Sequence, residues 1–167
     1  YPATRQTNQI DDYHGTRISD PYRWLEDDNS AETKAWVAEQ NIVTFGYLEQ
    51  IPSRVAIKDR LTQLWNYERY GIPFKQGGRY FVTKNNGLQN QTVLYTMDSL
   101  EASMRELLDP NKLSTDGTVA LTGYEVSEDG SLLAYGIAVA GSDRQEWRVR
   151  DVRTGNDLAD HIRWVKF

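Results

Sequence analysis

The sequence contains no cysteine, which excludes disulfide bonds, cysteine-ligated metal sites and a thiol nucleophile. Histidine is also scarce, since His14 and His161 are the only two and cannot alone complete a zinc site. No stretch approaches the roughly 18 consecutive apolar residues of a membrane-spanning helix. We therefore expect no metal, no cofactor and no membrane partner.

The N-terminus lacks the apolar core of a secretory signal. Because the chain starts with Tyr1 and not with Met, an export signal removed ahead of it would escape notice. We expect a cytoplasmic protein, with the periplasm or secretion as the alternative if such a signal was lost.

A concentration of positive charge is missing too. The formal net charge is −5 and the isoelectric point is about 5.1, and acidic and basic residues are mixed along the chain. This pattern argues against a nucleic-acid partner. Apolar residues make up 39% and aromatic residues 11% of the chain, which is enough to build a folded core.

The familiar catalytic motifs are absent as well. The sequence has no Gly-x-Ser-x-Gly elbow, phosphate-binding loop, His-Glu-x-x-His pair or EF-hand pattern. His14 follows Asp12 closely and could serve as a base beside a carboxylate, but a hydrogen-bonded histidine in a turn before Gly15 is the preferred interpretation. We expect no complete catalytic site within these residues.

Helix signals fill roughly the first 65 residues. Asp20, followed by proline, predicts a capped short helix over residues 20–28. Asn29 has capping-box spacing to a glutamate and opens an amphipathic helix over residues 29–50. A third helix is expected over residues 53–66. Most of the five tryptophans are expected in the core.

The pattern becomes alternating beyond residue 71, which is typical of strands. The expected strands cover residues 79–83, 92–96, 105–108, 124–126, 132–139, 147–152 and 162–167. An Asn-Gly step at residues 86–87 predicts a tight turn between the first two.

The two strand-rich stretches can be superimposed with an offset of roughly fifty residues. Gly78 then matches Gly130, and Asp98 matches Asp151. A unit of this length with about four strands is typical of a β-propeller blade, and two blades cannot close a ring. Since the sequence also stops inside an apolar run, we expect a fragment of a longer protein.

Several motifs, taken in order, resemble prolyl oligopeptidase along essentially the whole chain. The motifs are Asp12-Tyr13-His14-Gly15, Asp20-Pro21-Tyr22, Trp24-Leu25-Glu26-Asp27, Gly78-Arg79-Tyr80-Phe81, Leu108-Asp109-Pro110-Asn111, Ser127-Glu128-Asp129-Gly130 and Gly141-Ser142-Asp143. The resemblance implies a mixed fold: an N-terminal α-helical segment of an α/β-hydrolase peptidase domain (residues 1–66), then the first two of seven antiparallel four-stranded propeller blades (residues 67–167).

The resemblance also implies an activity that these residues could not perform alone. The family's serine endopeptidases cleave short peptides on the carboxyl side of proline, and their Ser-Asp-His triad would lie beyond residue 167. The expected partners are proline-containing oligopeptides and the remainder of the peptidase and propeller domains, in a protein that is a monomer at full length.

Two residues are candidates for substrate contact by the same resemblance. Phe167 matches a phenylalanine that lines a substrate pocket, with a blade-core aromatic as the alternative. Asp143 matches a loop that faces the central cavity, although a turn aspartate is the simpler interpretation. The polar run over residues 144–148 departs from the hydrophobic strand of the family.

Two readings from other classes stay open. One is a non-enzymatic propeller that binds partners through its N-terminal helices. The other is a small intact domain that dimerises through its open strand edges.

Overall fold

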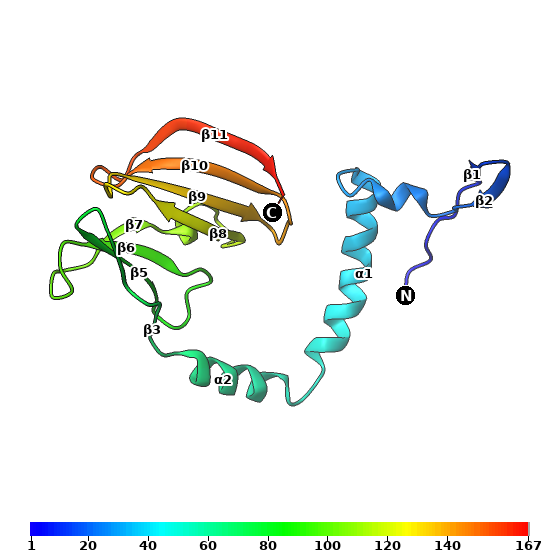
Figure 1. Ribbon diagram of the computed structural model, residues 1–167. Helices are drawn as coiled ribbons and strands as arrows, with labels where there is room; N and C mark the ends of the chain where they lie inside the picture. The colour runs from blue at the N-terminus through cyan, green and yellow to red at the C-terminus, as the bar shows by residue number, and fades with distance from the viewer. Residues whose placement is uncertain (167) are drawn as a thin grey trace. The chain divides into compact units, whose positions relative to one another are not determined.

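The computed structural model describes residues 1–166 and divides the chain into two compact units, Tyr1–Arg60 and Leu61–Phe167. Figure 1 shows the order of the elements along the chain. No helix among the described residues is both long and apolar enough to cross a membrane.

The first unit begins with a hairpin that the sequence pattern did not reveal. Its strands are β1 (Ile10–Tyr13) and β2 (Thr16–Ser19), paired antiparallel. The two turn residues, His14 and Gly15, both have positive φ, at 56° and 88°, which is the requirement of the tight primed turns. The Asp12 carboxylate accepts a hydrogen bond from the Gly15 amide at 2.6 Å. His14 is thus a turn residue.

The predicted short helix over residues 20–28 is only a 3-10 turn, η1 (Arg23–Glu26). Asp20 is not its N-cap, because its carboxylate instead holds the Arg23 guanidinium at 2.6 Å. The chain then passes into the long helix α1 (Ala31–Glu49). Ser30, and not Asn29, caps this helix, and its hydroxyl accepts a bond from the Thr33 amide at 3.1 Å.

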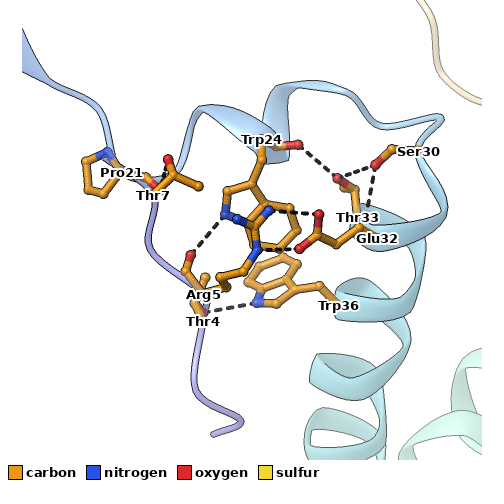
Figure 2. Close-up of polar contacts among 9 residues, drawn as sticks. All are labelled: Thr4, Arg5, Thr7, Pro21, Trp24, Ser30, Glu32, Thr33 and Trp36. Atoms are coloured by element: carbon orange, nitrogen blue, oxygen red, sulfur yellow. Dashed lines mark hydrogen bonds and ion pairs between the residues drawn. The ribbon is translucent and has the colours of Figure 1, made fainter. Parts of the chain in front are cut away.

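The N-terminal segment ahead of β1 is held against η1 and α1 by a cluster of polar contacts, shown in Figure 2. The Arg5 guanidinium makes a two-bonded ion pair with Glu32, at 2.5 and 2.8 Å, and lies 5.0 Å from the centre of the Trp24 ring. The Trp24 indole donates to the Arg5 carbonyl at 2.9 Å, and the Trp36 indole donates to the Thr4 hydroxyl at 3.0 Å. These contacts order the first residues without burying much apolar surface.

The second helix, α2 (Arg54–Trp65), follows a short connection. The amphipathic long helix leaves its apolar side chains mostly open to solvent in this chain, since Thr33 is the only buried residue of α1 and Tyr47 is 71% exposed. The prediction that most tryptophans lie in the core is wrong. Trp65 and Trp164 are exposed, and the other three are only partly buried.

The second unit contains two antiparallel sheets. The strands of the first are β3 (Arg69–Tyr70), β4 (Phe74–Gln76), β5 (Arg79–Asn85), β6 (Val93–Met97) and β7 (Arg105–Leu108). Their order is β3-β5-β6-β7, and β4 also pairs with β5. The predicted tight turn after β5 is a longer connection over residues 86–92, in which Gly87 has a φ of 115°.

The second sheet is a four-stranded meander that follows a 3-10 turn, η2 (Pro110–Lys112). Its strands are β8 (Val119–Val126), β9 (Leu132–Val139), β10 (Gln145–Asp151) and β11 (Asp157–Val165). The last strand begins five residues before the predicted start at 162. Gly78 and Gly130, which the offset of roughly fifty residues matched, lie one and two residues before β5 and β9, the equivalent strands of the two sheets.

The two sheets share one hydrophobic core, formed by inward-facing side chains of both. The buried members are Phe81, Leu94, Leu107, Leu108, Val126, Leu133, Tyr135 and Val152. Two arginines join the sheets at this core, because Arg105 donates to the Val152 carbonyl and Arg150 donates to the Leu107 carbonyl. A hydrogen bond from a charged donor is stronger than one between neutral groups. These two bonds, one from each sheet to the other, therefore hold the sheets together.

Candidate functional site at one end of the second sheet

The turn between β9 and β10 carries Asp143, one of the two predicted substrate contacts. The chain reverses through Ala140 and Gly141, whose φ angles are 51° and 75°. The Ser142 amide donates to the Val139 carbonyl at 3.0 Å, and the Ser142 hydroxyl accepts from the Arg144 amide at 3.1 Å. The turn is therefore fixed by its own hydrogen bonds, and it presents residues 143 and 144 outward.

The end of β11 lies beside this turn and is distorted by a bulge. Gln145 pairs with Val165 while Trp147 pairs with Ile162, so β11 has one residue more than β10 over this interval. Trp164 lies in the bulge with a φ of 61° and is 72% exposed. A bulky aromatic residue rarely adopts this conformation.

Two contacts join the turn to the end of β11. The Asp143 carboxylate forms an ion pair with Lys166 at 3.0 Å, and the Arg144 guanidinium lies 4.3 Å from the centre of the Trp164 ring. Asp143 is exposed and is a partner in an ion pair. Phe167, the other predicted contact, lies outside the described residues, directly after Lys166 in the sequence.

A cavity of about 260 Å³ opens between these elements. Its lining includes the apolar side chains of Ile137 and Val139, the ring of Trp164, and the charged side chains of Arg144 and Glu146. The combination of apolar surface with a few placed charges is typical of a ligand-binding cavity. The sequence pattern singled out neither Arg144 nor Trp164; the departure from the family pattern over residues 144–148 was the only signal near them.

The charge of Glu146 is compensated by its neighbours. His161 Nε2 lies 2.8 Å from the Glu146 carboxylate. The hydrogen bond with His161, helped by the charges of Arg163 and Arg148, lowers the pKa of Glu146. Glu146 is therefore ionised at neutral pH and already paired. No group of three or more His, Asp or Glu side chains in residues 1–166 is arranged to hold a metal ion.

The cavity thus combines an arginine, a carboxylate and an aromatic ring, which are groups that can bind and orient a ligand. The sequence profile of the family described as "Prolyl oligopeptidase, N-terminal beta-propeller domain" matches residues 1–167.

The chain belongs to this family. The prolyl endopeptidase of Elizabethkingia meningoseptica is 43% identical over 167 residues, which is all of this chain and 24% of that protein. Prolyl oligopeptidase A of Amanita bisporigera is 34% identical, and the alignment covers the whole chain and 25% of the relative. The chain thus spans about a quarter of the length of the relatives it matches.

Solved structures of the family share the fold. One, from a structural and mechanistic study of two prolyl endopeptidases, superposes with a TM-score of 0.81 at 34% identity, over 98% of this chain and 24% of the other. Prolyl oligopeptidase B of Galerina marginata, bound to a 25mer macrocyclization substrate, superposes with a TM-score of 0.76 at 26% identity, over 100% and 27% of the two chains. The two antiparallel sheets therefore belong to the N-terminal propeller domain of this family.

Proposed function

We propose that the chain is the N-terminal part of a serine endopeptidase that cleaves short peptides on the carboxyl side of proline. The observation that carries this proposal is the match to prolyl endopeptidases along the whole chain, at 43% identity. The groups that break the bond would come from the remainder of such a protein, and these residues would supply scaffold and access filter.

Within this proposal the two units have different tasks. The segment 1–66 would pack on the α/β-hydrolase domain, which is supported by the apolar side chains that α1 and α2 leave exposed, among them Ile42, Phe45 and Ile57. The segment 67–167 would form the first two of seven blades, which is supported by two antiparallel sheets that share one core. We also propose a cytoplasmic monomer for the full-length enzyme.

Asp143 and Phe167 are proposed as substrate-facing residues. Support for Asp143 comes from its outward position in a fixed turn beside the cavity at the end of β11. Phe167 follows the same strand in the sequence, and the family resemblance alone carries its assignment. Phe167→Ala in the full-length enzyme should weaken substrate binding more than it lowers the melting temperature.

The activity is tested on the full-length protein with two fluorogenic peptides that differ only in proline or alanine before the scissile bond. We expect cleavage of the proline peptide, loss of cleavage after treatment with a fluorophosphonate, and no turnover by residues 1–167 alone. A full-length protein that binds peptides and cleaves neither would favour the non-enzymatic propeller instead.

A further inference from the structure

We infer that the cavity at the end of the second sheet is a carboxylate-recognition subsite, in which Arg144, supported by Trp164, binds an anionic group of the peptide. The inference rests on the proposed peptidase function and adds a specificity to it. The anionic group is a carboxylate, either an acidic side chain or a free C-terminus of the substrate.

The backbone points to this place independently of the side chains. Residues other than glycine with positive φ are His14, Ala140 and Trp164 among those described. His14 and Ala140 each precede a glycine in a reversal of the chain, whereas Trp164 lies in the bulge of β11 and lines the cavity. Unfavourable backbone conformations of this kind persist where the surrounding structure fixes them and concentrate at binding sites. The bulge that imposes the conformation on Trp164 also brings its ring beside Arg144.

Arg144 has the chemistry and the freedom to take a carboxylate. The Trp164 ring centre lies 4.3 Å from the guanidinium carbon, and a guanidinium that contacts an aromatic ring keeps planar N–H donors that match a carboxylate. The two nearest acidic side chains have other partners, because Asp143 pairs with Lys166 and Glu146 pairs with His161. No ion pair joins Arg144 to a carboxylate in the part of the chain that the structure describes.

The local charge favours the same ligand. Arg144 and Glu146 are the charged side chains that line the cavity. The charges of Arg148 and Arg163 act on Glu146, and Lys166 pairs with Asp143. The two carboxylates are thus compensated by other cations, and Arg144 would attract an anionic substrate group and repel a cationic one.

The test compares matched peptides on the full-length enzyme. One set carries glutamate or glutamine at successive positions before the proline, and a second set has a free or an amidated C-terminus. We expect at least one acidic member to have a kcat/KM at least about tenfold above its neutral partner, the lower end of the range expected for a hydrogen bond to a charged group. A higher kcat/KM for glutamate than for glutamine in the first set assigns the carboxylate to a substrate side chain at that position. A higher kcat/KM for the free than for the amidated C-terminus in the second set assigns it to the C-terminus.

Three variants assign the effect. Arg144→Gln should reduce the ratio to about one, because it should lower kcat/KM for the acidic peptide more than for the neutral peptide, and Trp164→Leu should give an intermediate ratio. Arg153→Gln is the matched control, because Arg153 is an exposed arginine in the connection between β10 and β11, at the other end of β10. Arg153→Gln changes the net charge by the same amount as Arg144→Gln and should leave the ratio of kcat/KM between the acidic and the neutral peptide unchanged.

Equal rates for acidic and neutral peptides in the unmodified enzyme would overturn the inference and leave the proposed peptidase standing. A loss of both rates in Arg144→Gln together with a lower melting temperature would overturn it in favour of a packing role. If no proline peptide is cleaved, the peptidase proposal fails, and calorimetric titration with the same peptides still decides whether Arg144 prefers the carboxylate.

Discussion

Trp147 lies across two glycines, and this arrangement predicts how the second sheet responds to a single added methyl group. On the neighbouring strands, Gly136 pairs with Trp147 and Gly123 pairs with Gly136. A Cβ atom at Gly136 would lie 2.7 Å from Trp147 Cε2 and 2.8 Å from Thr122 Oγ1. A Cβ atom at Gly123 would meet the same indole at an ordinary 3.5 Å.

The expected cost of Gly136→Ala follows from these distances. The Cβ would be about 0.7 Å too close to an indole that cannot bend, and overpacking of this kind destabilises by about 1–3 kcal/mol. Alanine also restricts the unfolded chain, which offsets about 0.4–1 kcal/mol of that cost. The Thr122 hydroxyl and the Trp147 indole both donate to the Gln145 side chain, so a shift of either also disturbs these bonds. We expect a net loss of about 1–2 kcal/mol.

Hydrogen exchange of the full-length protein measures this loss locally. At tenfold per 1.4 kcal/mol, the protected amides of β9 should exchange about 5- to 30-fold faster in Gly136→Ala. Gly123→Ala should exchange no faster than the unmodified protein. Trp147→Phe combined with Gly136→Ala should cost less than the sum of the two single changes. Equal protection in the two glycine variants would refute the close contact.

Three further predictions test other parts of the fold. Ser30→Ala removes the cap of α1 and should cost about 1 kcal/mol, seen as faster exchange in the first turn of that helix and not in β9. Leu133→Ala empties a fully buried position and should cost about 2–5 kcal/mol; an unchanged melting temperature would contradict the shared core. Hydrogen bonds from Ser127 and Ser131 lower the pKa of Asp129 to about 2 from its ordinary 3.8, so ionised Asp129 stabilises the fold above that ordinary value and loses the effect as the pH falls toward 2. Between pH 5 and 2 the melting temperature of Asp129→Asn should therefore fall less than that of the unmodified protein.

The local sequence patterns predicted the regular elements well. The long helix was expected over residues 29–50 and is found at Ala31–Glu49, and strand β9 was expected and found over residues 132–139. In both cases many residues favour the same structure, so the pattern is strong. The cap of the helix was misplaced by one residue because Ser30 and Asn29 are both good caps, and only the backbone angles distinguish them.

The elements that were missed have weak or polar patterns. The β1–β2 hairpin turns on His14 and Gly15, which lack the usual Asn-Gly signal, and its strands are mostly exposed. The first half of β11 contains Asp157 and Asp160 and reads as a loop, yet it pairs with β10 as an edge strand. Polar residues are compatible with an edge, so alternation alone could not reveal it.

The candidate site could not be read from the sequence for a further reason. Asp143 was identified through the family resemblance, whereas Arg144 and Trp164 come together through a bulge that adds one residue to β11. The bulge places two residues, Arg163 and Trp164, opposite the single position between Gln145 and Trp147, and Trp164 has a positive φ there. Deleting Arg163 should restore regular pairing, change the backbone angles of Trp164 and move its ring relative to Arg144 while preserving the sheet. In the full-length enzyme, the deletion should abolish the preference for acidic peptides, and a preserved preference would show that the bulge does not position Arg144.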